Sequence, residues 1–355
     1  MKCKRMMVVA IALTAPAAVI HGQPSANVTV FATGLDGPRG LKFGPDGNLY
    51  VAEAGSGGLV STVGICEQVP GPVGPSFGGK TARISKITPQ GVRTTVVDGL
   101  PSRKSSLTPP DYLGVAEVAF YRGALYALLN GGGCSHGNPD IPNGVIRVDI
   151  GQGTWEMVSD LSAFFATHPV ANPDAGDFEP DGTPYSMIEA FGQLYIVEAN
   201  HGRLLKLNPA GQVHQVVDVS LTESHIVPTA IATDGTQFFL GNLSTFPIVP
   251  GSAAIQTLSV GGKFTSYTGG FTTIVGLAFD ALHRLYALEL STDAGFPAPG
   301  TGKVVRLNPG GGIEDIATGL VVPTAMTFGP DGALYVSNFG AAPPGTGQIV
   351  RITVP

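Results

Sequence analysis

The sequence has no excess of positive charge. Its 355 residues hold 20 Lys and Arg against 26 Asp and Glu, which gives a formal net charge of −6. Nucleic acids and anionic membrane surfaces attract proteins through clusters of Lys and Arg. We therefore expect neither nucleic acid nor membrane as a partner. An unidentified small molecule or another protein is expected instead, bound to a monomer.

The sequence also lacks an apolar run long enough for a membrane-spanning helix, which needs about 20 residues. The longest apolar stretch, residues 6–20, is shorter and follows the basic residues Lys2, Lys4 and Arg5. This pattern is typical of a signal peptide. We predict a signal peptide over residues 1–22, followed by one domain over 23–355 that is secreted or periplasmic. A retained N-terminal anchor is the alternative.

Cysteine is scarce. Of three cysteines, Cys3 lies in the predicted signal peptide, so Cys66 and Cys134 remain. Because export leads to an oxidising compartment, we predict that these two form a disulfide between neighbouring long loops; two free thiols are the alternative. The histidines show neither H-x-x-x-H nor H-E-x-x-H spacing, so no zinc site is indicated.

Helical patterns are almost absent, with residues 161–169 the only candidate for a short helix, but a repeat is present. GPRGLKFGPDGNLYVAEAG at 37–55 returns as VPTAMTFGPDGALYVSNFG at 322–340. Each copy has two apolar strands joined by a tight Gly-Pro-Asp-Gly turn. The centre of the second strand recurs six times, at Tyr50-Val51, Tyr126-Ala127, Tyr195-Ile196, Phe239-Leu240, Tyr286-Ala287 and Tyr335-Val336.

A third strand follows in all six units. A fourth follows in five of them, because the last unit stops at Pro355. VTVFATGL at 28–35 supplies the missing strand, because it resembles GIEDIATGL at 312–320. The sequence therefore predicts an all-β, six-bladed β-propeller whose N-terminal strand closes the ring in the last blade, which leaves no open sheet edges. The predicted blades are 37–100, 113–161, 184–221, 226–271, 272–320 and 321–354 with 27–35.

Long connections all fall at one end of the predicted strands. The turns between strands one and two, and between strands three and four, are tight, whereas the other connections include the inserts 55–80, 101–112, 131–143 and 162–183. Since loops on a rigid scaffold commonly carry function, we expect the ligand or partner on this face. Aromatic side chains in or beside these loops either line an apolar pocket or pack beneath the loops: Phe77, Phe246, Phe296 and Phe339.

Polar side chains recur three residues after the position of the second-strand Tyr. Five of the six units carry an oxygen-bearing side chain there, and the sixth carries Leu129: Glu53, Glu198, Asn242, Glu289 and Asn338. Oxygens that converge on an axis would suit Ca²⁺, which takes six to eight oxygen ligands. The alternative is that each side chain accepts hydrogen bonds from backbone N–H groups of the next loop. Glu117 and Glu189, on innermost strands, could add to such a ring.

A second candidate calcium site is the acidic segment 172–186, which holds Asp174, Asp177, Glu179 and Asp181. Its spacing is not that of an EF-hand, and Asp in such loops also serves turn formation. Nearby, His201 is the histidine most open to a catalytic role. Ser135 lies in a Gly-x-Ser-x-Gly pattern but lacks the strand–turn–helix context of a nucleophile elbow.

Three stretches resemble the ScyD/ScyE family of exported bacterial β-propellers: FATGLDGPRGLKFGPDGNLYVAEAG, TARISKITPQGVRTTVVDGLPS and NPDAGDFEPDGTPYSMIEAFGQLYIVEANHGRLLKLNPAGQV. The resemblance covers nearly the whole mature chain, and the acidic stretch before the third blade is its most specific part. The chain departs from the family pattern at GVAEVAF, 114–120, where a Gly-Pro-containing strand start is expected. The resemblance implies fold and export but no defined reaction.

Two functions follow as hypotheses. The first is a secreted binding or scaffold protein of the ScyD/ScyE type, which acts through the face of long loops. The second is a metal-dependent lactonase or esterase of the gluconolactonase-like kind. In the second case Glu53, Glu198, Asn242 and Glu289 would hold Ca²⁺, and His201 would act as acid or base.

Overall fold

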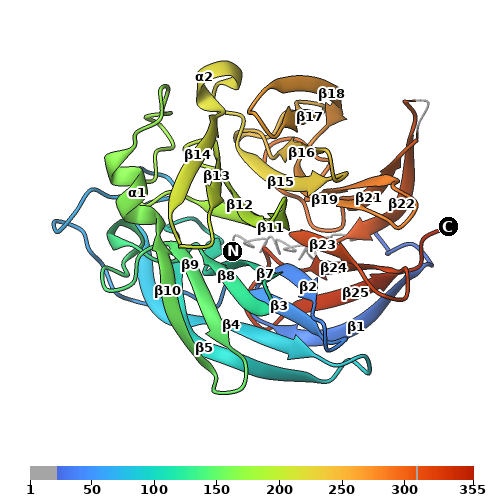
Figure 1. Cartoon of the computed structure of the whole chain (residues 1–355), viewed down its shortest axis with the longest axis horizontal. Helices are drawn as coiled ribbons and strands as arrows, with labels where there is room; N and C mark the ends of the chain where they lie inside the picture. The colour runs from blue at the N-terminus through green and yellow to red at the C-terminus, as the bar shows by residue number, and fades with distance from the viewer. Residues whose placement is uncertain (1–21, 309–310) are drawn as a thin grey trace, which may run out of the picture.

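The structure, a computed structural model, describes residues 22–308 and 311–355. All of the predicted signal peptide except Gly22 therefore lies outside the described residues. Six antiparallel sheets stand around a central axis (Figure 1), so the predicted six-bladed propeller is confirmed. No helix in the described ranges is long and apolar enough to span a membrane.

Each blade has an innermost strand next to the axis and three further strands towards the rim. The innermost strands are β2 (Pro38–Phe43), β7 (Val115–Tyr121), β11 (Pro184–Ala190), β15 (Pro228–Thr233), β19 (Ile274–Phe279) and β23 (Ala325–Phe328). The second strands are β3 (Leu49–Glu53), β8 (Ala124–Leu129), β12 (Gln193–Glu198), β16 (Gln237–Asn242), β20 (Leu285–Glu289) and β24 (Leu334–Asn338). The third strands are β4 (Phe77–Ile87), β9 (Gly144–Asp149), β13 (Arg203–Leu207), β17 (Ala253–Ser259), β21 (Gly302–Leu307) and β25 (Gly347–Ile352). The outer strands are β5 (Arg93–Lys104), β10 (Thr154–Asp160), β14 (Val213–Asp218), β18 (Phe264–Phe271), β22 (Ile313–Leu320) and β1 (Val28–Leu35).

The ring closes as the sequence predicts. Strand β1, from the N-terminal end, pairs antiparallel with β25, from the C-terminal end, with Val28 opposite Ile352. The last sheet therefore has the order β1-β25-β24-β23. This pairing satisfies the backbone groups of β25 that would otherwise form an exposed sheet edge.

The repeated Gly-Pro-Asp-Gly-x-Leu-Tyr pattern has a local cause. In the first blade the Tyr50 hydroxyl donates a hydrogen bond to Asp46 in the turn, over 3.0 Å. In the last blade Tyr335 bonds Asp331 in the same way, over 3.1 Å. The turn glycine Gly47 has a φ of 75°, which favours a residue without a side chain. The repeated residues thus hold each tight turn against the strand that follows it, through the hydrogen bond from Tyr to Asp.

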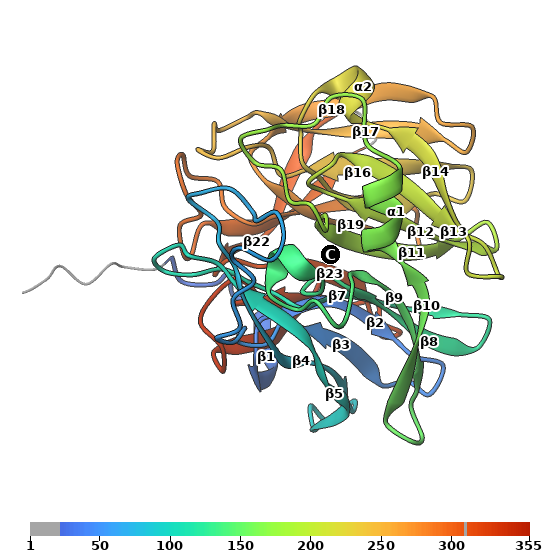
Figure 2. The same ribbon diagram turned by 90° about the vertical axis from the view of Figure 1, so that its left-hand side faces the viewer.

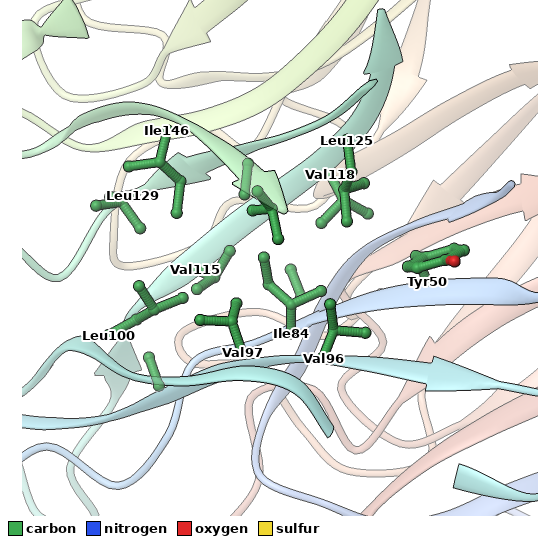
Figure 3. Close-up of a cluster of buried hydrophobic side chains, with 14 residues drawn as sticks. Tyr50, Ile84, Val96, Val97, Leu100, Val115, Val118, Leu125, Leu129 and Ile146 are labelled. Atoms are coloured by element: carbon green, nitrogen blue, oxygen red, sulfur yellow. The ribbon is translucent and has the colours of Figure 1, made fainter. Parts of the chain in front are cut away.

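Apolar side chains on both faces of each blade pack against the neighbouring blades. Between the first and second blades, Ile84 and Leu100 meet Val115 and Leu125 in one buried cluster (Figure 3). Leu129, the one apolar residue at the repeated polar position, belongs to this cluster. Burial of this kind stabilises a ring because each blade covers its neighbours.

The long inserts contain more structure than the sequence indicates. Strand β4 begins at Phe77, inside the predicted insert 55–80, and β5 continues to Lys104. These extensions pair with each other, and β6 (Tyr112–Leu113) adds a fifth strand to the first blade. Apolar alternation does not mark these strands, because Gly78, Gly79 and the polar residues after Pro101 interrupt it.

The helical content is small. Helix α1 (Leu161–Thr167) lies within 161–169, the one stretch that the sequence offers as a candidate helix. Its N-terminus is capped by Asp160, which accepts a hydrogen bond from Ala163 N over 2.8 Å. The short helix α2 (Ser220–Glu223) and the 3₁₀ turn η1 (Cys134–His136) were not predicted. A single turn is too short to show helical periodicity.

Seen from the side of the ring, the two ends of the propeller differ (Figure 2). The long connections gather at one end, which we call the long-loop face. The tight turns between strands one and two, and between strands three and four, lie at the other end, the plain face. Each innermost strand begins near the long-loop face and ends at the plain face.

Candidate functional site

The five repeated polar side chains are buried. Each accepts at least one hydrogen bond from a backbone N–H group of its own blade or of the loop that enters it. Glu198, at the end of β12, accepts hydrogen bonds from three backbone N–H groups. They belong to Thr183, Asn200 and His201, at 2.7, 3.0 and 2.9 Å. The carboxylate therefore fixes the loop before β11 and the turn after β12.

Glu53 and Glu289 repeat this arrangement and add cations. Glu53 accepts a hydrogen bond from Asp36 N over 2.7 Å and forms ion pairs with Arg83 at 3.2 Å and Arg93 at 3.0 Å. Glu289 accepts one from Thr272 N over 2.6 Å, and Lys303 Nζ lies 3.7 Å away. Burial raises the pKa of Glu289, and the Thr272 N–H and the lysine charge offset this only in part.

The two asparagines complete the set. Asn338 accepts a hydrogen bond from Val321 N over 2.8 Å. Asn242 accepts one from Ala254 N over 2.8 Å and donates to the Ile226 carbonyl. Except in Asn242, at least one accepted N–H comes from the segment that enters the innermost strand of the same blade. The repeated residue thus fastens the incoming chain to the end of the second strand.

These residues do not fit the predicted calcium set. Their oxygens already accept N–H groups, and the arginines beside Glu53 and the lysine beside Glu289 would repel a cation. Across residues 22–308 and 311–355, no three His, Cys, Asp or Glu side chains are placed to hold one metal ion. The geometry supports the alternative weighed for these positions, local hydrogen bonding of loop backbone.

The carboxylates of the acidic segment 172–186 each contact a different part of the fold. Asp174 accepts a hydrogen bond from Gly176 N within its own turn. Asp177 lies 3.1 Å from His225 Nε2, and the pKa of His225 is raised because this contact outweighs the opposing effect of burial. Asp181 accepts hydrogen bonds from the backbone N and the hydroxyl of Ser135. The structure does not bring these carboxylates together.

Glu179 lies at the centre of a buried charge network. Its carboxylate contacts His136 Nε2 at 2.8 Å and Arg103 at 3.6 Å, and Arg103 also pairs with Asp111 at 3.0 Å. Burial opposes ionisation of Glu179, but the Arg103 charge and the His136 contact outweigh it and lower the pKa to about 2. The network joins the segment before the third blade to two neighbouring long loops.

His201 is packed rather than exposed to a substrate. The residue is 4% exposed. Its ring stacks on that of Phe178 with the ring centres 4.8 Å apart, and it meets the Phe165 ring edge-on at 5.1 Å. Its Nε2 lies 2.9 Å from the Glu179 carbonyl. The hypothesis of an acid or base role for His201 therefore has no geometric support. Ser135 likewise bonds Asp181 rather than a histidine.

The predicted disulfide between Cys66 and Cys134 is confirmed, with the two Cα atoms 6.3 Å apart. It anchors residues 59–65, which we call the apolar loop. Val60 exchanges two backbone hydrogen bonds with Gly78, at 3.0 and 2.8 Å, and the Thr62 hydroxyl donates to the Cys134 carbonyl. Leu59 and Ile65 are nevertheless 86% and 73% exposed.

The aromatic residues of the loops do not share one location. Phe246 and Phe296 stack on each other at 5.9 Å, and both are exposed. A two-residue backbone bridge between Ile248 and Gly295 holds their loops together. Phe77 is half-buried in β4, where Lys104 lies 6.0 Å from its ring centre, and Phe339 is half-buried as well.

Two cavities follow the propeller axis, and they meet at Glu117, Ser186, Val275 and Ala325. The one toward the long-loop face has a volume of about 20 Å³, enough for one water molecule. The one toward the plain face has a volume of about 370 Å³ and is walled by all six innermost strands. Its charged residues are Lys42, Glu117 and Glu189; of these, the sequence indicated the two glutamates but not Lys42.

Comparisons with known proteins agree with the fold. No family model and no curated protein sequence matches the chain. Solved structures similar to it include regucalcin, a calcium-binding protein of Agrobacterium tumefaciens strain C58, at a TM-score of 0.56 and 14% identity over 92% of both chains. A gluconolactonase of Xanthomonas campestris has a TM-score of 0.54 and 11% identity over 92% of this chain and 89% of its own. A protein of unknown function from Bacteroides thetaiotaomicron has a TM-score of 0.58 and 11% identity over 94% and 77%.

Proposed function

We propose that this chain is an exported propeller of the ScyD/ScyE type that binds a protein partner through its long-loop face. The family assignment rests on the three sequence stretches quoted above. Export rests on the predicted signal peptide and agrees with the disulfide between Cys66 and Cys134, since disulfides persist in oxidising compartments.

The apolar loop is the observation that carries the proposal. Leu59, Val60, Val63 and Ile65 are all exposed within seven residues. The backbone bridge to Gly78 and the disulfide hold them in place, so binding would cost little conformational entropy. Apolar side chains that remain in water on a rigid loop are typical of a docking surface. A protein is favoured over a membrane because the chain carries net negative charge.

The hydrolase hypothesis has less support. The similar structures include a gluconolactonase and regucalcin, but at these identities they show the fold alone. The residues that would have held calcium accept hydrogen bonds or pair with cations, as Glu53 does with Arg83 and Arg93. The axial cavity on the long-loop face is too small for a lactone or ester substrate.

Site-specific photo-crosslinking in the cells that produce the protein tests the proposal. A photoreactive amino acid at Leu59 should trap one recurrent protein partner. The matched control is Leu282, which is 73% exposed in a tight turn of the plain face. In a second experiment Ile65→Ser should abolish the adduct at Leu59 without lowering the melting temperature, because Ile65 is exposed.

Equal adducts at Leu59 and Leu282, or none at Leu59, would contradict a docking role for the apolar loop. Persistence of the Leu59 adduct in the Ile65→Ser variant would show that the loop is near the partner but does not bind it. Hydrolysis of a lactone by the purified protein, dependent on calcium and lost in Glu198→Gln, would restore the second hypothesis.

A further inference from the structure

The larger axial cavity opens away from the long-loop face and is independent of the docking surface proposed above. Its volume of about 370 Å³ lies in the range of small-molecule sites. Its exposed wall is polar and apolar in nearly equal parts. Met187, Ile231, Leu277 and Met326 border it from four different blades, with most of each side chain buried between blades. A mixed wall of this kind suits a small ligand that carries both a polar group and an apolar body.

Glu117 is the deepest charged group of this cavity, at the neck that joins it to the smaller one. Its Oε1 accepts a hydrogen bond from the adjacent Val118 N over 3.1 Å. Within the described ranges this is its one hydrogen bond, and no Lys, Arg or His nitrogen lies within 4 Å. The acids of the long-loop face, by contrast, nearly all have a cation or several N–H groups beside them.

The fold makes room for this carboxyl group. Gly40, on the adjacent strand β2, faces it so closely that a Cβ there would lie 1.9 Å from Glu117 Oε1. Any side chain at position 40 would displace the Glu117 carboxyl group from its present place. The Glu117 carboxyl group on β7 therefore occupies space that is free because residue 40 on β2 is a glycine.

We propose that the plain-face axial cavity binds a small ligand with a primary ammonium group and an apolar body, and that the ammonium pairs with Glu117. A carboxylate that ionises in apolar surroundings without a partner is costly, and an ammonium removes that cost. A calcium ion would need several more oxygen ligands than Glu117 and Glu189 provide. An ammonium needs one carboxylate.

The other charged and titratable groups around Glu117 do not supply that partner. Lys42 on β2 and Glu189 on β11 lie in the exposed, wider part of the cavity, and Arg39 and Tyr185 lie on the other side of the neck. Strands β15, β19 and β23 contribute no titratable side chain to the wall. Burial raises the pKa of Glu117 to about 8, an effect that the Val118 N–H and the Lys42 charge offset only in part.

Protonation of Glu117 gives the binding a measurable signature. At neutral pH the free carboxyl is mostly protonated, so pairing with an ammonium must release its proton to solvent. Affinity should therefore rise by up to tenfold per pH unit between pH 6 and 8 on general linkage grounds, since one proton leaves per ligand bound.

Titration calorimetry of the purified protein with benzylamine tests this, with benzyl alcohol as the uncharged ligand of the same shape. Benzylamine should bind at least tenfold more tightly than benzyl alcohol. Measurements in two buffers of different ionisation enthalpy should show release of close to one proton. Glu117→Gln, which keeps the size of the side chain, should weaken benzylamine at least tenfold and abolish proton release, while Glu156→Gln on the exposed rim should change neither.

Three results would overturn the proposal. They are the absence of benzylamine binding at millimolar concentration, equal affinity for benzylamine and benzyl alcohol, and unchanged binding in Glu117→Gln. The pH dependence of benzylamine binding to the unaltered protein serves the same purpose without any variant, because an affinity independent of pH from 6 to 8 would contradict pairing with Glu117.

Discussion

Glu179 is buried and Glu117 is partly exposed to the axial cavity. Desolvation opposes ionisation of both, yet their surroundings move their pKa values in opposite directions. Around Glu179, Arg103 and His136 lower the pKa to about 2. Around Glu117, burial among apolar strands raises it to about 8. Both start from the same ordinary value, so the presence or absence of a neighbouring cation decides the direction.

This difference separates the two ends of the propeller. On the long-loop face, acidic side chains connect loops to each other and to the blades through ion pairs and hydrogen bonds, so their charges stabilise the fold. In the axial cavity, the Glu117 carboxyl group contacts no other strand through a hydrogen bond or ion pair within the described residues. A desolvated acid that contributes nothing to the fold is the better candidate for a ligand.

The largest expected effect comes from removing the charge of Glu179. Glu179→Gln leaves Arg103, which is only 2% exposed, without its buried partner and weakens the contact with His136. Breaking such a buried pair costs about 3–5 kcal/mol. Chemical denaturation at pH 7 should show this loss, and Glu156→Gln, whose partner Arg147 is exposed, should lose less than about 1 kcal/mol. A similar small loss in both variants would mean that the network does not stabilise the loops.

The opposite sign is expected for Glu117. Because its pKa is higher in the folded than in the unfolded chain, the folded protein holds a proton that the unfolded chain has lost, and stability falls as pH rises from about 4.5 to about 8. Glu117→Gln removes this loss. The variant should match the unaltered protein near pH 5 and exceed it near pH 9 by roughly 2–4 kcal/mol. Denaturation curves at both pH values measure this, and equal stability at pH 9 would contradict an uncompensated Glu117.

The smallest effect is expected at Asp177 and His225, a more exposed pair on the long-loop face. His225 has a raised pKa, so its contribution to stability is present below the ordinary histidine value and is lost as pH rises through the folded value. Asp177→Asn should lower the pKa of His225 and cost less than about 1 kcal/mol at pH 6. Histidine proton NMR follows the titration directly, and an unchanged His225 pKa would show that Asp177 does not set it.

The sequence predicted the fold better than the site. Strand alternation, the Gly-Pro-Asp-Gly turns and the resemblance of 28–35 to 312–320 were enough for six blades and ring closure. The disulfide followed from having two cysteines in adjacent long loops. The extra strand β6 and the helix α2 were missed because pairs of residues and single turns carry no periodic signal.

The calcium role of the repeated polar residues stays a prediction, and the sequence alone could not distinguish it from backbone hydrogen bonding. A polar residue that recurs at the end of each second strand has the same appearance whether it binds an ion or a backbone N–H group. The distinction depends on groups distant in sequence, such as Arg93 beside Glu53, or Gly40 beside Glu117. No sequence pattern links Arg39 and Lys42 on β2 with Tyr185 on β11, and only the ring brings them to the axis.

The most direct test of this account is the pKa of Glu117 itself. Carbon-13 NMR of protein labelled at the glutamate side-chain carboxyl groups gives a titration curve for each glutamate, and the signal missing in Glu117→Gln identifies Glu117. The account predicts that this signal titrates near pH 8 and shifts to lower pH when benzylamine is added. A titration near the ordinary glutamate value, unaffected by benzylamine, would show that the axial carboxyl is solvated or paired and would contradict the central claim.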